Sequence, residues 1–252
     1  MAELKKPLLF ALCLLPIAVA AGIFVGFYQL DVYSEEILAE VIAVLGSTDV
    51  LILISAVQTV GYALFCGFFG CILAHKTGLW RPLRPERRKL LTTLGISLLF
   101  GAVFSLDHWS FGSVIDDIQA ANEASLTASG VIASVLYGGI VEEVMLRLFL
   151  MSLIAFGVWK LFFRKYEKKA IPACVFVMAN IVAALLFAAG HLPATVSTFG
   201  TLTPLLVFRC FLLNGGFGLF FGWLYRKYGI AYAMLGHAMM HIVCKAIWLA
   251  FV

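Results

Sequence analysis

Long uncharged runs alternate along this chain with short charged segments. A helix needs about 20 apolar residues to cross the ~30 Å hydrocarbon core of a bilayer. Runs that approach or exceed this length lie at residues 7–30, 50–74, 90–106, 124–146, 170–190, 204–225 and 230–252. Because every backbone polar group in lipid must be paired within its own segment, such runs form helices. The pattern predicts an all-α, polytopic transmembrane helical bundle with about seven spans.

The fourth run raises the question of an eighth span. Its helix-compatible pattern continues from residue 124 to residue 163, which at 1.5 Å per residue gives about 60 Å, twice the hydrocarbon thickness. If 147–163 returned through the membrane as a separate span, the basic KYEKK segment at 165–169 would move to the acidic side of the protein. We expect one passage that continues beyond the membrane.

Composition and charge place the protein in the cell membrane. The chain is 63% hydrophobic and 13% charged, whereas soluble domains carry about 25% charged residues. Of the 18 Lys and Arg, 15 lie at Lys5, Lys6, 76–89, 160–169, Arg226 and Lys227, while 31–49 and 107–123 hold nine Asp and Glu and no Lys or Arg. This alternation predicts a multi-pass protein with a cytoplasmic N-terminus. It also accounts for the +4 net charge, so no nucleic-acid partner is expected.

The six cysteines lie in apolar segments, and none forms a CxxC pair. We interpret them as small buried hydrophobic residues rather than as a disulfide framework or a zinc site.

Several ionisable residues remain inside the predicted spans, where charge is costly and usually functional. They are Glu142, Glu143, Arg147, His191, Arg209, His237, His241 and Lys245. On a helix, Glu143 and Arg147 are an i,i+4 pair on one face, and Arg147 can hold Glu143 ionised in a low dielectric. Glu142 points about 100° away from Glu143 and therefore needs another partner.

The histidines are the candidate partners. If 142–163 and 170–191 form an antiparallel hairpin about the 165–169 turn, Glu142 and His191 lie at similar height. His237 and His241 share one helix face, a spacing that can hold one metal ion or one substrate oxygen. Lys245 continues that face and is expected to snorkel, with a cationic member of the site as the alternative. Arg209 is expected to snorkel outward or to pair with a helix end.

Four motifs occur in a fixed order: EExxxR (Glu142, Glu143, Arg147), FxxxH (Phe187, His191), an NGxxxG-containing span from Asn214 to Tyr225, and HxxxH (His237, His241). Together they resemble the CPBP family, which includes CAAX prenyl endopeptidases and bacteriocin-processing or Abi-type membrane proteins. The resemblance covers roughly 124–245, and divides the chain into N-terminal transmembrane helices at 1–123 and a catalytic transmembrane core at 124–252.

The resemblance implies an intramembrane endopeptidase that cleaves a membrane-associated peptide or protein tail. Glu142 and His191 would activate the attacking water, His237 and His241 would stabilise the oxyanion, and Glu143 and Arg147 would support the architecture. A divalent metal such as zinc, held by the three histidines and Glu142, is the alternative source of the same chemistry. Two positions depart from the family pattern: Leu148, where glycine is frequent, and His241, where asparagine is common.

Two other functions are open on the sequence. The departures at Leu148 and His241 are compatible with a non-catalytic membrane partner, such as a bacteriocin-immunity or chaperone-like protein that keeps the fold. Buried carboxylates and histidines also line the ion paths of proton- or metal-coupled transporters. The chain shows no convincing repeat symmetry and no second polar pathway, which disfavours a transporter.

Overall fold

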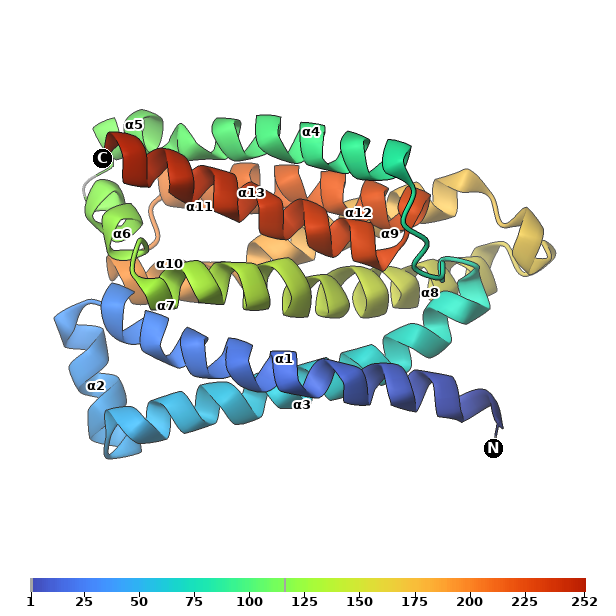
Figure 1. Cartoon of the computed structure of the whole chain (residues 1–252), viewed down its shortest axis with the longest axis horizontal. Helices are drawn as coiled ribbons and strands as arrows, with labels where there is room; N and C mark the ends of the chain where they lie inside the picture. The colour runs from blue at the N-terminus through green and yellow to red at the C-terminus, as the bar shows by residue number, and fades with distance from the viewer. Residues whose placement is uncertain (1, 116) are drawn as a thin grey trace.

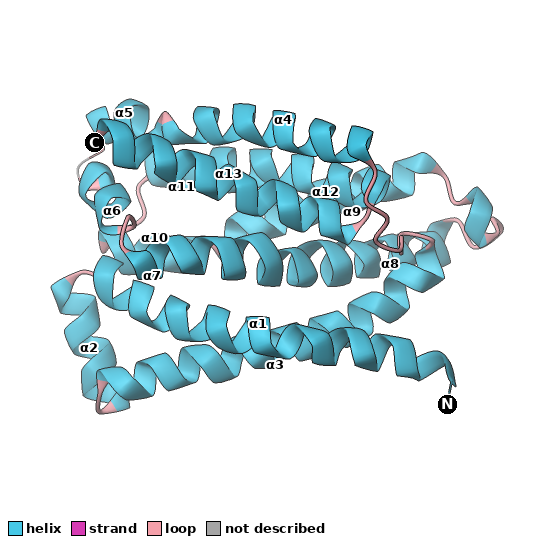
Figure 2. Cartoon of the chain, viewed as in Figure 1, coloured by secondary structure: helices cyan, strands magenta, loops and turns pink. Residues whose placement is uncertain are grey.

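Helices make up nearly all of the protein in the computed structural model, which describes residues 2–115 and 117–252 (Figures 1 and 2). The long elements are α1 (Ala2–Val32), α3 (Thr48–Thr77), α4 (Arg87–Ser105), α9 (Ala173–Gly190), α12 (Gly216–Tyr228) and α13 (Ile230–Phe251). The fourth passage is built from α7 (Ala128–Ala133), η2 (Ser134–Glu142), η3 (Val144–Met151) and α8 (Ser152–Phe162). The described residues contain no strand.

Within the described residues, seven helical stretches are long and apolar enough to cross a membrane, which confirms the predicted number. The fourth runs without interruption from Ala128 to Phe162, and Figure 1 shows α7 and α8 on one line through the bundle. The single long passage is therefore correct, and the eighth span is not formed. Both η2 and η3 are π-helical, a detail that the plain α-helical expectation missed.

The basic and acidic segments lie at opposite ends of the bundle. The turns that follow α3, α8 and α12 lie at the end that holds the N-terminus (Figure 1). The acidic segments contain short helices rather than loops: α2 (Glu35–Leu45), α5 (Asp107–Ser110), η1 (Phe111–Ser113) and α6 (Ile118–Ala124). They occupy the other end, together with α10 (Leu192–Phe199) (Figure 1). The charge asymmetry read from the sequence is thus an asymmetry of the folded molecule.

Apolar side chains cover the outside of the bundle, as lipid contact requires. Among the large hydrophobic residues exposed there are Leu53, Val57, Leu98, Leu99, Leu185 and Leu186. Four cysteines are buried as expected, but Cys13 and Cys174 are exposed, so the expectation of six buried cysteines was wrong for these two. In a bilayer an exposed thiol on an apolar helix needs no polar partner, which removes the reason to bury it.

The fourth passage is the centre of the bundle. Its π-helical part contacts α1 and α3 on one side and α9, α12 and α13 on the other, and Figure 1 shows the α1–α3 hairpin on one side of the passage and α4, α12 and α13 on the other. A Cβ atom at Gly139 would lie 2.9 Å from the Cα atom of Ala238 and 2.7 Å from its Cβ atom. The glycine pair Gly138–Gly139 therefore allows the passage and α13 to approach at backbone distance.

Replacing Gly139 with alanine should separate these two helices. Backbone atoms of α13 occupy the space of the new methyl group, so the helix must shift. We expect Gly139→Ala to lower the detergent-solubilised melting temperature by several degrees, equivalent to about 1–3 kcal/mol of overpacking. Gly157→Ala, on the same passage with no atom within 4 Å of its Cβ position, is the matched control. Equal melting temperatures for the two variants would contradict the close approach.

The charge asymmetry also generates a prediction of orientation. By the positive-inside rule the basic end, with the N-terminus, should face the cytoplasm. In a cysteine-free background on intact cells, a membrane-impermeant maleimide should label Glu36→Cys, at the acidic end, and leave Lys165→Cys, at the basic end, unlabelled. The reverse pattern would overturn the orientation.

Candidate active site

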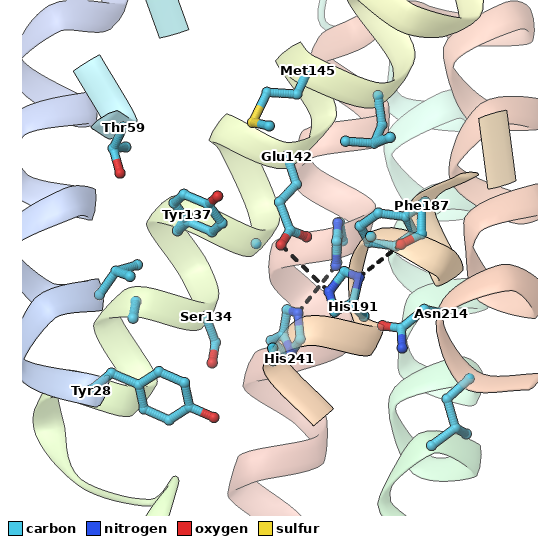
Figure 3. A pocket seen from close by; sticks show the side chains of 18 of the residues that line it. Tyr28, Thr59, Ser134, Tyr137, Glu142, Met145, Phe187, His191, Asn214 and His241 are labelled. Atoms are coloured by element: carbon cyan, nitrogen blue, oxygen red, sulfur yellow. Dashed lines mark hydrogen bonds and ion pairs between the residues drawn. The ribbon is translucent and has the colours of Figure 1, made fainter. Parts of the chain in front are cut away.

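Glu142 and His191 meet across two passages that are distant in sequence. The Oε1 atom of Glu142 lies 3.7 Å from Nε2 of His191, as the hairpin geometry predicted. Figure 3 shows the two side chains directed toward each other. Glu142 ends η2, and His191 caps the C-terminus of α9 directly before α10, which begins at Leu192. The i+5 hydrogen bonding of η2 belongs to a helix type that is frequent at functional sites.

The ring of His191 is held in one tautomer by its own helix. Its Nδ1 atom lies 2.9 Å from the carbonyl oxygen of Phe187, and because a carbonyl only accepts, Nδ1 carries a proton. In the neutral ring Nε2 is then an unprotonated acceptor that faces Glu142. A separation of 3.7 Å is too long for a direct hydrogen bond, but it allows one water in the cavity to contact both atoms at about 2.8 Å.

Glu143 points away from Glu142 and joins three passages. Its Oε1 atom lies 3.2 Å from NH1 of Arg147 and 2.9 Å from Nδ1 of His237 on α13. Arg147 in turn donates from NH2 to the carbonyl oxygen of Gly218 on α12, over 3.0 Å. Glu143 is 0% exposed and Arg147 2% exposed. The divergence of the two adjacent glutamates is as the helical geometry predicted, and Glu143 and Arg147 occupy supporting positions.

His237 and His241 form the opposite wall of the site. Their Nε2 atoms lie 3.1 Å apart. Since the Glu143 carboxylate accepts from Nδ1 of His237, the neutral His237 ring has an unprotonated Nε2, and Nε2 of His241 must donate to it. The network thus places a proton on His241 Nε2, at the surface of the cavity.

Aromatic rings hold these polar groups in place. The ring of Phe221 stacks on His237 at a centroid distance of 4.2 Å, and Phe187 packs edge-on against His191 at 4.5 Å. The Arg147 guanidinium lies 4.8 Å from the centroid of the Phe187 ring, a cation–π distance. Phe187 was part of a sequence motif, whereas Phe221 was missed because one more phenylalanine in an apolar span gives no signal.

One cavity of about 550 Å³ is lined by all four candidate catalytic residues. The passages that bear them contribute one wall, and α1 and α3 contribute another, which includes Tyr28, Gln29, Ser55 and Thr59. Figure 3 shows Tyr28 and Thr59 on the far side of the space from Glu142. These polar residues were missed, since single hydroxyls and amides are ordinary in a membrane helix. Asn214 also lines the cavity; it lay in a quoted motif without an assigned role.

Two expectations about charged residues were wrong. Lys245 does not snorkel: it is 5% exposed, and its Nζ atom donates to the carbonyl oxygen and Oγ of Ser125, at 2.7 and 2.9 Å. Arg209 neither snorkels nor pairs with a helix end: its Nε atom lies 2.7 Å from Oδ1 of Asp107 in a two-pronged ion pair. Asp107 begins the acidic segment and Ser125 lies just beyond it, so the chain at this end of the bundle offers each cation a partner within reach.

The comparisons with known proteins identify part of the chain. Residues 123–243 match the family model of the type II CAAX prenyl endopeptidases, described as Rce1-like. This region of the chain, somewhat less than half of its length, is similar to that family. No significant match to a curated protein or to a solved structure was found.

The similarity of residues 123–243 to the Rce1-like family supports an intramembrane CAAX-type endopeptidase, which is a hydrolase. Proteins of that family act on prenylated peptides or proteins in a membrane. The match ends near His241 and begins just before the fourth passage, so α1, α3 and α4 lie outside it. Of the two departures from the family pattern, Leu148 is 0% exposed and packs against Gly70 on α3, away from the cavity. Only His241 stands in the site.

The three histidines and Glu142 are also the candidate ligands of a divalent metal. Among the described residues, no group of three or more His, Cys, Asp and Glu side chains is placed to hold one ion. Nδ1 of His237 and of His191 are engaged by Glu143 and by the Phe187 carbonyl. The rings are thereby oriented toward one another and toward Glu142, and we derive no step through a metal.

Removing Arg147 should destabilise the protein more than the loss of an exposed ion pair does. Arg147→Ala leaves the Glu143 carboxylate buried without its cation, a change that costs about 3–5 kcal/mol. We expect aggregation or a large fall in melting temperature. Lys89→Ala is the control, because Lys89 and Glu86 form an exposed pair at 2.6 Å whose loss costs about 0–1 kcal/mol. Similar melting temperatures for the two variants would show that the Arg147 pair is not a structural requirement.

Proposed function

We propose that the protein hydrolyses a peptide bond of a membrane-associated peptide or protein tail, with water activated by Glu142 and His191. The observation that carries the proposal is the 3.7 Å approach of Glu142 Oε1 and His191 Nε2 on the wall of the 550 Å³ cavity. A carboxylate and an imidazole acceptor that share a water can take its proton as it attacks a carbonyl carbon.

The histidines of α13 are suited to the developing negative charge. As the water oxygen bonds to the carbon of the scissile bond, the carbonyl oxygen becomes an oxyanion, which N–H donors stabilise. His241 Nε2 bears a proton that it shares with His237, and an oxyanion is the stronger acceptor. Collapse of the intermediate breaks the C–N bond, and the proton held by Glu142 or His191 passes to the leaving nitrogen.

The depth of the site supports a substrate that enters from within or beside the membrane. By helix rise, Glu142 lies about 20 Å from the start of its passage at Ala128, and His237 about 20 Å from the end of α13. The two are therefore level, well inside the hydrocarbon. The cavity wall also includes apolar side chains such as Met145, Leu186 and Phe217, which suit an apolar or lipid-modified peptide.

The decisive experiment is cleavage by the purified protein in detergent or liposomes. Glu142→Gln keeps the size of the side chain and removes the base, so we expect cleavage of a prenylated CAAX-type peptide to fall by about 10²–10⁴-fold. Glu36→Gln, in the exposed helix α2, is the matched control and should cleave like the unchanged protein. A folded Glu142→Gln protein with full activity would exclude the proposal and favour a non-catalytic partner.

The same assay separates the water-only mechanism from a metal mechanism. We propose that the histidines act as hydrogen-bond donors, so cleavage should survive o-phenanthroline and EDTA. His241→Asn, which keeps an N–H donor but is a poor zinc ligand, should retain more activity than His241→Ala. Loss of activity with chelator, restored by zinc alone, would replace this mechanism with a metal one.

A further inference from the structure

The catalytic cavity extends from Glu142 toward the acidic end of the bundle. Its wall includes Tyr33, which directly follows α1, and Ala194 and Thr198 of α10. Figure 1 shows α10 and the C-terminal end of α1 at the end of the bundle opposite the N-terminus. A second cavity, of about 250 Å³, shares part of this wall and also reaches α6 and α10. Hollow space therefore connects the candidate catalytic groups with the acidic end.

Toward the basic end the cavity is closed by the apolar core. Among the described residues, its wall contains no residue of α3 beyond Thr59 and none of the fourth passage beyond Leu146. The side chains that follow are packed: Ala63 is 1% exposed, and Leu148 and Met151 are both 0% exposed. All three belong to one cluster of buried hydrophobic residues. A polar molecule at the basic end would have to cross this apolar layer to reach the site.

Polar side chains lie between the site and the acidic end. By helix rise, Tyr28 is about 6 Å from the end of α1, and Ser55 and Ser134 are about 10 Å from the start of their passages. Glu142 is about 20 Å from the start of its passage by the same measure. All four line one cavity. In Figure 3, Tyr28 and Ser134 lie on one side of Glu142 and Met145 on the other. The hydroxyl groups thus lie toward the acidic end, whereas Met145 lies toward the closed end.

The direction of the opening determines how water reaches the reaction. Hydrolysis consumes a water molecule, which must arrive at Glu142 inside the hydrocarbon. Water inside a protein occupies places that are roomy and that offer polar partners. The hydroxyl-lined part of the cavity meets both conditions, whereas the packed layer of Leu148 and Met151 meets neither. Water is therefore expected to arrive from the acidic end.

Four exposed residues mark where the cavity meets its surroundings. They are Gln58 on α3, Leu186 and Gly190 on α9, and Ala194 on α10. Gly190 ends α9 and Ala194 lies in the next helix, so this edge continues to the acidic end. Because unpaired backbone groups are costly in lipid, the extended segment of a membrane-anchored peptide is favoured inside the polar cavity. Its anchor can stay in the lipid beside α3 and α9.

We propose that the site is entered from the side of the membrane that the acidic end faces, and that the substrate is a membrane-anchored peptide whose hydrophilic segment lies on that side. By the positive-inside rule this is the extracytoplasmic side. The assignment of the substrate rests on the proposed function, whereas the sided opening is a property of the fold. A peptide presented at the basic end meets the closed apolar layer instead.

The reactivity of single cysteines tests the opening. In a cysteine-free background, Ser134→Cys places a thiol in the cavity wall, and a protein that keeps only Cys66 has its thiol in the buried cluster. A charged, membrane-impermeant methanethiosulfonate is added to right-side-out and to inverted vesicles. Glu36→Cys and Lys165→Cys report which end of the bundle faces the reagent. We expect Ser134→Cys to react from the Glu36→Cys side and not from the other, and Cys66 to react from neither.

The remaining outcomes of the labelling would overturn the opening. They are reaction of Ser134→Cys from the basic end or from both ends, and reaction only with a membrane-permeant maleimide. Failure to react with every reagent would do the same, because the reactive thiolate forms where a cysteine is accessible to water.

Cleavage tests the substrate separately. Proteoliposomes are prepared with the protein in one orientation, and a prenylated peptide with a charged segment that cannot cross the bilayer is added outside. We expect cleavage when the acidic end faces outward and loss of cleavage when the basic end does. The reverse preference would overturn the inference and leave the proposed hydrolysis intact. Sided labelling without cleavage of any peptide would exclude the proposed function and still support the sided opening.

Discussion

The buried carboxylate of Glu143 is the interaction on which the site depends. A charge with no access to water must be compensated on the spot, and Glu143 is compensated by Arg147 on its own passage and by His237 on α13. Arg147 extends the network to α12 through the carbonyl oxygen of Gly218. Three passages that apolar packing alone would leave free to slide are thereby fixed in register. The orientation of His237, and through it that of His241, follows from this network.

That constraint gives the two adjacent glutamates different positions. Because Glu143 faces the interior of the bundle, its neighbour must face a different direction, and η2 ends so that Glu142 is turned into the cavity. Glu142 is accordingly the less constrained of the pair: Arg147, the cation of its own passage, pairs with Glu143 instead, and Glu142 approaches His191 at a distance that one water can bridge. Glu143, through its buried pair with Arg147, thus holds the helix that presents the adjacent candidate base Glu142 to the cavity.

Sequence reasoning reached the features that have a strong local signal. Hydropathy gave the seven passages, charge alternation gave the separation of basic and acidic ends, and helical spacing gave the Glu143–Arg147 pair. The approach of Glu142 to His191 was predicted because two helices of an antiparallel hairpin rise equally on either side of the turn at 165–169. The sequence does not reveal contacts between distant segments. The partner of Arg209 is Asp107, and that of Lys245 is Ser125. Nothing local to either cation marks these partners, so snorkelling was the natural expectation. The π-helical geometry of η2 and η3 likewise has no residue pattern of its own.

The cavity wall formed by α1 and α3 lies outside the region that matches the family model. The family match begins at residue 123, yet Tyr28, Gln29, Ser55 and Thr59 from the preceding helices line the same cavity as Glu142. Gln29 and Ser55 are joined by a hydrogen bond of 2.9 Å across α1 and α3, and Gly22 brings the two helices to backbone contact near Ala56. These contacts hold a polar surface opposite the candidate catalytic groups, on helices that lie outside the region that carries the family motifs. The cavity is therefore completed by α1 and α3, while the Glu143 network holds the passages of the matched region.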